Sequence, residues 1–307
     1  MAQTPNPPPT KKPGIYPRLI DKWIARYAQP SALALDAVAD LKPAVVVTGG
    51  SRGIGLALAR RFAKAGHDVA ILARNNGALR DAAAAIERDF GVKAHAIAID
   101  ITDPDTPRSL DAQLSQRGYY LDILVNSAGI GLSGRFESHD EKKVVHLLDL
   151  NVTALTRLMH HALPAMLARG RGGILNVASL GGLAAGPYQA AYYASKGYVI
   201  SLTEAAAWEC AGEGVRLTVV APGPVDTSFH EAMGAESSFY RLLLPALSPE
   251  RTANSAYSGY VLGRCLVVPG VTNTIMAIAL RILPHTLLLP LVGWLLHPRE
   301  NPDDGGR

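Results

Sequence analysis

Short apolar runs alternate with amphipathic runs along most of this chain. From residue 44 onward the apolar runs contain almost no polar positions, which is typical of strands that are buried on both faces. They predict strands over residues 45–48, 68–73, 93–99, 123–126, 173–178, 216–220 and 265–268. Between them, apolar positions recur at helical spacing and predict helices over residues 53–65, 77–90, 104–117, 151–168 and 189–210. This alternation indicates an α/β fold with helices on both faces of a parallel sheet.

The first predicted strand runs into a glycine-rich turn that begins after Thr48. Such a turn aims the first backbone N–H groups of the next helix at one point, and glycines allow an anion to approach closely. We expect that anion to be the pyrophosphate of a dinucleotide, held by Gly49, Ser51, Arg52, Gly53, Ile54 and Gly55. A turn with a purely structural role is the alternative. The fold that we predict is a single Rossmann-type, doubly wound sheet of about seven parallel strands.

The coenzyme preference depends on the end of the second predicted strand. Sites that select NAD usually carry an acid about 20 residues after the glycines, whereas an arginine there suits the 2′-phosphate of NADP. Here the strand ends at Arg74, and Arg52 lies in the glycine turn, so two guanidinium groups are available for one phosphate. We therefore expect NADP(H) in preference to NAD(H), although each arginine alone is typical of a solvated surface. Asp100 follows the third strand and is expected to contact the adenine, or to be a simple turn residue.

Residues 1–43 precede this domain. Residues 1–14 form a Pro-rich tail without the apolar core of a secretory signal, residues 16–27 predict a basic amphipathic helix, and residues 32–41 predict a weaker helix. The amphipathic helix is interpreted as packing on the domain or on a sister subunit. Contact with an anionic membrane surface is the alternative.

Residues 269–307 form an apolar extension with a polar tail. Between residues 271 and 296 the only formal charge is Arg281, and Pro284 and Pro290 interrupt the apolar run. A membrane-spanning helix needs about 20 uninterrupted apolar residues, so we expect a segment that lies on the surface or at an interface. A subunit interface, a cover for the core, peripheral membrane contact and a wall for an apolar substrate remain alternatives.

Composition narrows the function classes. The chain has 307 residues, 48% of them hydrophobic, a net charge of +4 and scattered basic residues with few aromatic ones, which does not favour nucleic-acid binding. Cys210 and Cys265 form no C-x-x-C pair, so we expect no disulfide framework and no metal site. The sequence predicts a cytoplasmic protein, with contact at the inner face of a membrane left open.

A tyrosine and a lysine at i and i+4, Tyr192 and Lys196, share one face of a predicted helix, and Ser179 precedes them after an apolar strand. Together with the TGxxxGxG turn and the NSAG segment at residues 126–129, this set resembles the classical short-chain dehydrogenase/reductase family over residues 44–268. The Ser127 of NSAG replaces an asparagine of the family pattern.

The resemblance implies roles for further residues. Asn151 matches the fourth catalytic residue, which helps to hold a water relay to Lys196; a helix cap is the alternative. Lys196 is also implied to bind the nicotinamide ribose. The other residues implied to line the cofactor cleft are Asn126, Ala128, Gly129, Pro222, Gly223, Val225 and Thr227. Among these residues, the backbone at Val225 and the Thr227 hydroxyl are implied to contact the nicotinamide amide.

The reaction implied is hydride transfer between nicotinamide and a carbonyl carbon, with Tyr192 as acid for reduction and base for oxidation, and Ser179 bound to the carbonyl oxygen. A free phenol titrates near 10, so we expect the cations of Lys196 and oxidised nicotinamide to lower the pKa of Tyr192.

Finer motifs resemble the branch with long-chain ketoacyl reductases, ketosphinganine reductase and hydroxysteroid dehydrogenases, which implies a bulky, lipid-like ketone or alcohol. A lid is predicted over residues 225–263, with an apolar wall formed by Phe229, Met233, Phe239, Tyr240 and residues 242–244. We expect a homodimer or homotetramer. The alternatives are a catalytically silent dinucleotide-binding sensor or scaffold, and a membrane-peripheral interaction protein.

Overall fold

The computed structural model describes residues 15–235, 238–240 and 245–297, and it contains one parallel sheet of seven strands in the order β3-β2-β1-β4-β5-β6-β7. All the pairings are parallel. The strands are β1 (Lys42–Thr48), β2 (Asp68–Ala73), β3 (Ala94–Ala98), β4 (Tyr119–Asn126), β5 (Gly172–Val177), β6 (Val215–Val220) and β7 (Leu266–Val267). The predicted Rossmann-type fold class is confirmed. Strand order reverses between β1 and β4, and in open α/β sheets the carboxyl ends of such strands are where a ligand crevice is expected.

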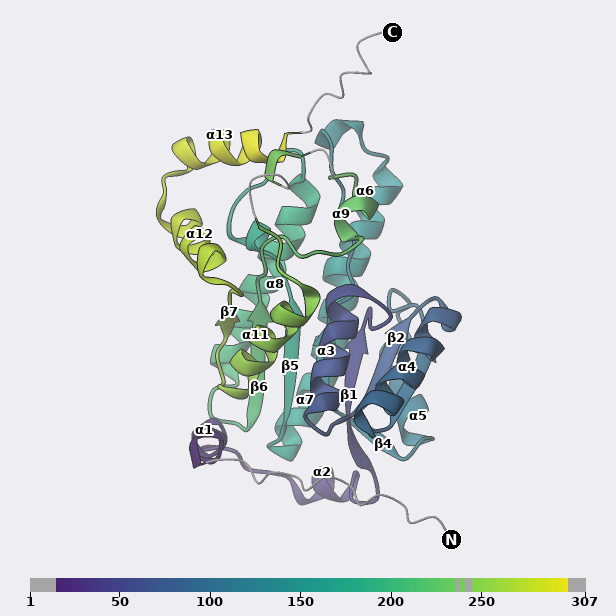
Figure 1. The fold of residues 1–307 in the computed structure, drawn as a ribbon. Coiled ribbons are helices and arrows are strands. Elements are labelled where there is room, and N and C mark those ends of the chain that lie inside the picture. Colours follow the sequence, from purple (N-terminus) through teal and green to yellow (C-terminus); the bar gives the residue numbers. More distant parts are fainter. Residues whose placement is uncertain (1–14, 236–237, 241–244, 298–307) are drawn as a thin grey trace.

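Helices cover both faces of the sheet, as Figure 1 shows. One buried cluster is lined by helices α3 (Gly53–Lys64), α4 (Asn76–Phe90) and α11 (Pro249–Val261). The cluster on the other face is lined by helices α5 (Thr106–Ser115), α7 (Leu155–Arg169) and α8 (Ala190–Glu209). Alternate residues of β1 enter the two clusters: Val45 and Val47 face α3, and Val46 faces α7. This alternation explains why the strand has no polar face.

Helices α6 (Glu141–Leu148) and α11 are among those that were not predicted from the sequence. Helix α6 is capped by Asp140, and α11 is capped by Ser248, whose hydroxyl accepts a hydrogen bond from the Arg251 N–H at 3.2 Å. Ser248-Pro249 is a recognisable helix start. The second half of the segment predicted as a lid therefore folds as α11, which packs on α3 in the core.

The chain between β4 and β5 is one long helical run. It passes from α6 through a π-helical segment, Asp149–Ala154, directly into α7. The helix predicted to begin at residue 151 therefore begins ten positions earlier, at Glu141. Short helical turns follow β4, β5 and β6 at Phe136–Ser138, Leu180–Leu183 and α9 (Phe229–Ala232).

The terminal extensions lie at opposite ends of the molecule (Figure 1). Helices α1 (Ile15–Ile24) and α2 (Ala32–Asp36) lie near the amino ends of the strands, where Ile24 is buried against Gly263. Helices α12 (Val271–Ile282) and α13 (His285–Leu296) lie near the carboxyl ends. Within the described ranges, no helix has both the length and the apolar character needed to cross a bilayer.

Candidate active site

The glycine turn joins β1 to α3. Gly49 and Gly53 adopt φ values of 66° and 57°, in the region that favours glycine. A Cβ atom at Gly55 would lie 2.3 Å from the Gly49 carbonyl oxygen, so a side chain there would force α3 away from the turn. Arg52 precedes the helix without capping it, and Ser51 and Ile54 are half-buried in the same turn. The first N–H groups of α3 therefore remain available to a phosphate ligand.

Thr48 ties this turn to the segment after β4. Its Oγ1 accepts hydrogen bonds from the backbone N–H groups of Ser127 at 3.0 Å and Ala128 at 3.1 Å. A Cβ atom at Gly49 would lie 2.9 Å from the Ala128 Cα. The glycine turn and the NSAG segment are thus packed directly together at the crevice where strand order reverses.

Asn126 stabilises the sheet from inside. Its Nδ2 donates to the Asn176 Oδ1 at 2.9 Å, and the Asn176 Nδ2 donates to the Thr203 Oγ1 at 2.8 Å. All three side chains are buried, so this ladder links β4, β5 and α8 through the core. The Asn126 side chain is therefore held in the protein interior by this ladder.

The residues predicted to select the coenzyme lie at the carboxyl ends of β2 and β3. Asp100 Oδ1 accepts from the Thr102 N–H at 3.0 Å and from the Thr102 hydroxyl at 2.8 Å. These bonds, with a smaller contribution from the charge of Arg74, lower the pKa of Asp100. Asp100 thus forms a turn, and its contact with the adenine stays a prediction. Arg52 and Arg74 are exposed, and neither forms a side-chain hydrogen bond or ion pair within the described part of the chain.

Ser179 and Tyr192 meet above the end of β5. Ser179 follows the strand, and its Oγ accepts from the Gly181 N–H at 3.1 Å. The Ser179 and Tyr192 hydroxyls form a hydrogen bond that by itself lowers the pKa of Tyr192. Burial is the larger influence, however, and Tyr240 adds to it, so the pKa of Tyr192 is raised. The sequence does not show how deeply the phenol is buried, and the lowering of its pKa in the presence of oxidised nicotinamide stays a prediction.

Lys196 lies one turn after Tyr192 on the same face of α8. Its Nζ lies 5.8 Å from the centre of the Tyr192 ring and donates to the Val177 carbonyl oxygen at 2.9 Å. The side chain is buried, which lowers the pKa of Lys196 to about 8. The predicted juxtaposition of the phenol and the amine is therefore present.

Asn151 occupies the π-helical segment before α7. Its Oδ1 accepts from the Ile130 N–H at 2.9 Å, and its Nδ2 donates to the Ile130 carbonyl at 2.8 Å and to the Ser195 Oγ at 3.1 Å. A Cβ atom at Gly129 would lie 3.0 Å from Asn151 Oδ1 and 3.4 Å from Lys196 Nζ. Asn151 and Lys196 therefore flank Gly129, and the helix-cap alternative for Asn151 is wrong because the helical run continues through it.

The segment after β6 reaches back to the glycine turn. A Cβ atom at Gly53 would lie 3.4 Å from the Thr227 Cγ2. Pro222 accepts a backbone hydrogen bond from Leu180 at 2.8 Å, and Val225 pairs with Leu247. These contacts place the segment between the glycine turn and the loop that carries Ser179.

Asn273, a residue that sequence reasoning missed, fixes this segment from α12. A Cβ atom at Gly223 would lie 2.4 Å from the Asn273 Oδ1, and the Asn273 Nδ2 donates to the Pro269 carbonyl at 2.7 Å. The C-terminal extension therefore supports the site directly. The available signal was an amide side chain at the start of an otherwise largely apolar segment.

An apolar cluster encloses Tyr192. The Phe229 ring lies 5.6 Å from the Tyr192 ring, and the cluster also contains Met233 and Tyr240, as predicted for the apolar wall. Residues 242–244 lie outside the described residues. Helix α13 contributes three further buried side chains, Leu288, Val292 and Leu296, from the extension for which a substrate wall was one of the alternatives.

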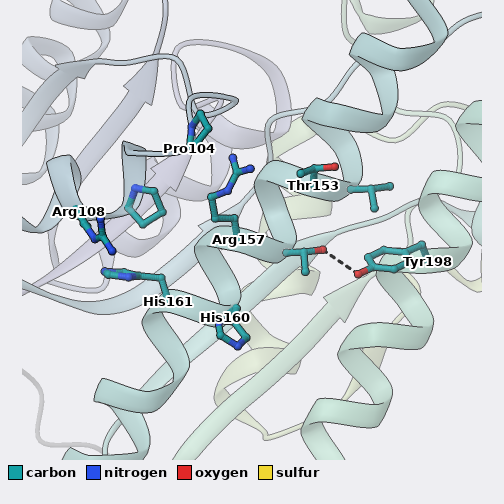
Figure 2. Close-up of a pocket in the computed structure, with 10 residues that line it drawn as sticks. Pro104, Arg108, Thr153, Arg157, His160, His161 and Tyr198 are labelled. Carbon is teal, nitrogen blue, oxygen red and sulfur yellow. Dashed lines mark hydrogen bonds between the residues drawn. The ribbon is translucent and has the colours of Figure 1, made fainter.

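A separate hollow of about 580 Å³ lies along α7, between the start of α5 and Tyr198 of α8 (Figure 2). Arg108, Arg157, His160 and His161 line part of it, and Tyr198 forms a hydrogen bond with Thr156 at 3.0 Å. None of the predicted catalytic or cofactor residues lines this hollow. Among the described residues, no three His, Cys, Asp or Glu side chains gather to hold a metal ion.

Comparison with known families gives the same picture as the geometry. The model of the short chain dehydrogenase family matches residues 43–238, more than half of the chain. The chain belongs to the short chain dehydrogenase family. The matched region extends from β1 to the segment after β6, so it contains all the residues of the glycine turn and of the Ser179, Tyr192 and Lys196 set.

Relatives within this family include reductases. The ketoacyl reductase HetN of Nostoc sp. is 34% identical over 181 residues, which are 59% of this chain and 63% of that protein. The match thus spans less than two thirds of the Nostoc protein. The 3-oxoacyl-(acyl-carrier-protein) reductase FabG of Staphylococcus aureus is 32% identical over 194 residues, which are 62% of this chain and 78% of that protein.

Solved structures in the family are similar over a larger part of the chain. A short-chain dehydrogenase from Sphingobium yanoikuyae in complex with NADPH is 29% identical with a TM-score of 0.70, covering 78% of this chain and 92% of that one. The bulky-bulky ketone specific alcohol dehydrogenase from Comamonas testosteroni is 26% identical with a TM-score of 0.65, covering 75% and 87%.

Proposed function

We propose that this protein is an NADP(H)-dependent oxidoreductase that interconverts an apolar ketone and the corresponding secondary alcohol. The observation that carries the proposal is the set formed by the half-buried Ser179 and the buried Tyr192 and Lys196. Each side chain has a partner that fixes its position, and the phenol lies at the border between polar groups and an apolar cluster. A scaffold without turnover would not need such a phenol.

The residues of the crevice fit a dinucleotide. The close approach of Gly55 to Gly49, and the start of α3 without a side-chain cap, provide a cradle that a Cβ atom would fill. Gly49, Gly53 and Gly55 would hold the pyrophosphate, Arg52 and Arg74 the 2′-phosphate, and Gly129, Val225 and Thr227 the nicotinamide side. When bound, the nicotinamide supplies or accepts the hydride.

The exposed Arg52 and Arg74 support NADP(H) over NAD(H). Their guanidinium groups carry no described partner, and no acidic side chain follows β2 directly. A 2′-phosphate would gain charge-assisted hydrogen bonds from both. The NADPH complex of the Sphingobium relative supports the same preference.

Tyr192 and Ser179 perform the chemistry at the carbonyl oxygen. Because burial raises the pKa of Tyr192, the phenol keeps its proton at neutral pH, which is the state that a general acid needs. During reduction it gives this proton to the carbonyl oxygen as negative charge develops there, while the Ser179 hydroxyl donates a hydrogen bond to the same oxygen. Lys196 lies beside Gly129 and Asn151. It binds the nicotinamide ribose and takes part in the relay that returns a proton to the phenol.

The environment of Tyr192 supports an apolar substrate. The side chains around the phenol are aromatic or aliphatic, and a charged substrate group would lose its hydration there without compensation. The ketoacyl and bulky-ketone reactions named for two relatives are compatible with this substrate class.

The proposed function is tested by coenzyme absorbance with a panel of ketones and secondary alcohols, from small to steroid-like and long-chain compounds. We expect turnover of apolar members with NADPH or NADP⁺, and weaker turnover with NADH or NAD⁺. Tight coenzyme binding without turnover of any panel member would instead support a sensor or scaffold.

A second role, peripheral membrane contact, is favoured by the exposed face of α12. Val271, Ile275, Ile278 and Ile282 recur at helical spacing and are 54–78% exposed. Residues 271–297 contain no acidic residue, so an anionic lipid surface would not repel them. We propose that this stripe rests on a lipid surface.

Vesicles of anionic lipid test this second role. Ile275→Glu with Ile282→Glu should reduce co-sedimentation about tenfold or more, whereas Leu33→Glu, at an exposed apolar position on α2, should not. Equal binding of all variants would contradict the proposal. So would a dimer, seen by light scattering, in which a second copy of the chain covers the stripe and which Ile275→Glu with Ile282→Glu therefore dissociates.

A further inference from the structure

A hollow of about 510 Å³ lies between α13 and the loop that leads into α8. Its lining contains no Lys, Arg, Asp or Glu, and consists of Pro187, Tyr188, Phe239, Pro290, Gly293, Trp294 and His297. We call these residues the α13 groove. The aromatic and proline rings give the groove apolar walls, so it suits a hydrocarbon ligand rather than a charged one.

The groove adjoins the apolar cluster that surrounds the catalytic phenol. Tyr188 lies four positions before Tyr192, and both rings belong to the same apolar cluster. Helix α13 lies between the two: Leu288, Val292 and Leu296 pack in that cluster on one of its faces, and Trp294 lies on the groove side. Tyr188 both lines the groove and packs against the cluster, so it joins the groove to the surroundings of Tyr192.

Specific contacts hold α13 over the loop. A Cβ atom at Gly293 would lie 3.5 Å from the Pro187 ring, so the helix backbone crosses the loop closely at this glycine. The Trp294 ring stacks on the Phe239 ring at 5.3 Å and 11°. Trp294 is nevertheless 51% exposed, which leaves part of its ring available to a ligand.

Tyr188 has a strained backbone at the inner end of the groove. Its φ of 63° is the one positive value of a non-glycine residue among the described residues. Its carbonyl accepts from the Gly134 N–H at 2.8 Å, and its ring meets the His297 ring at 4.9 Å. Strain of this kind is maintained when the surrounding structure needs a side chain in one direction, here toward α13.

We infer that the α13 groove binds the apolar tail of the substrate, an alkyl or acyl chain attached to the carbonyl that Tyr192 protonates. The inference rests on the proposed function and narrows it to substrates with a long hydrocarbon tail. Small ketones reach Tyr192 without occupying the groove. The C-terminal extension, which lies beyond the region matched by the family, thereby becomes part of the substrate site.

The test uses methyl ketones from butanone to dodecanone with the full-length protein and NADPH. In the wild type, kcat/KM should rise about three- to fourfold per methylene until the groove is filled. Trp294→Ala removes a wall, and Gly293→Leu fills the groove from a position where a first Cβ atom meets only ordinary contact with Pro187. Both variants should reduce the dodecanone-to-butanone ratio of kcat/KM at least tenfold.

Trp208→Ala is the matched control. Trp208 is 83% exposed and lies at the last turn of α8, whereas the loop that lines the groove precedes the first turn of that helix. It should leave the dodecanone-to-butanone ratio unchanged. An unchanged ratio in both groove variants, or an equal loss with every ketone, would overturn the inference.

A binding measurement separates this inference from the proposed function. Trp23→Phe with Trp208→Phe leaves Trp294 as the sole tryptophan, because the chain has three. In the absence of coenzyme, dodecanone should change the fluorescence of Trp294, whereas butanone should not. A change in Trp294 fluorescence without turnover of any ketone would support binding in the groove and contradict the proposed oxidoreductase activity. Turnover without a change in fluorescence would support the activity and contradict binding in the groove.

Discussion

Tyr192 and Lys196 lie one helical turn apart on α8, and burial shifts their pKa values in opposite directions. The pKa of the phenol is raised, and that of the ammonium is lowered to about 8. Both shifts favour the neutral form, as expected for two groups removed from water. The protein by itself therefore keeps the proton on Tyr192 rather than forming a phenolate–ammonium pair.

The lowered pKa of Lys196 predicts how stability depends on pH. The unfolded chain binds a proton at Lys196 up to the usual lysine pKa of about 10.4, whereas the folded chain loses it near pH 8. Between these values the unfolded state binds more protons, so this residue makes the free energy of unfolding rise with pH. Below pH 8 its cost to stability is constant.

Urea unfolding of the wild type and of Lys196→Met at pH 7, 8 and 9.5 measures this effect. The difference in unfolding free energy between the two proteins should move in favour of the wild type by about 2 kcal/mol from pH 8 to 9.5. Lys196→Arg, which stays charged, should not show the rise. A difference that is independent of pH would contradict the lowered pKa.

Arg52 and Arg74 predict coenzyme selectivity. Changing both to Ala should raise the dissociation constant for NADPH by about tenfold or more for each guanidinium group, while NADH binding changes little, because only NADPH carries the 2′-phosphate. Isothermal titration with both coenzymes measures this. Arg80→Ala, at an exposed position on α4, is the control. Equal losses for both coenzymes would rule out the phosphate site.

The buried ladder from Asn126 to Thr203 predicts a loss of stability rather than of chemistry. Asn126→Ala removes the donor to Asn176 and leaves a polar atom unpaired in the core, which should cost about 1–3 kcal/mol of unfolding free energy. Denaturant titration measures this cost. A variant as stable as the wild type would mean that the ladder has little weight in the fold.

The sequence predicted the sheet well because its signals are local. The apolar runs at β1, β2 and β5 and the glycine turn each depend on neighbouring residues alone. Helix α11 was not predicted although Ser248 and Pro249 carry a helix-start signal, because the segment around it also fits a lid over the substrate. The π-helical segment around Asn151 depends on contacts with Ile130, which is distant in sequence.

The site could be predicted in outline only. Spacing on one helix face was enough to bring Tyr192 and Lys196 together, but the pKa of the phenol depends on burial by distant elements such as the segment with Tyr240. The participation of α13 beside Tyr192 was likewise hidden, because its apolar residues are equally compatible with an interface.

The most direct test of the central claim is the turnover of Tyr192→Phe with NADPH and an apolar ketone, beside Tyr193→Phe. Tyr193 is half-buried, and its ring packs against Gly181 and Gly186. We predict that Tyr192→Phe lowers kcat by about 10²- to 10⁴-fold, with NADPH affinity within about threefold of the wild type, and that Tyr193→Phe stays active. Wild-type turnover by Tyr192→Phe would contradict the assignment of the phenol as the proton donor.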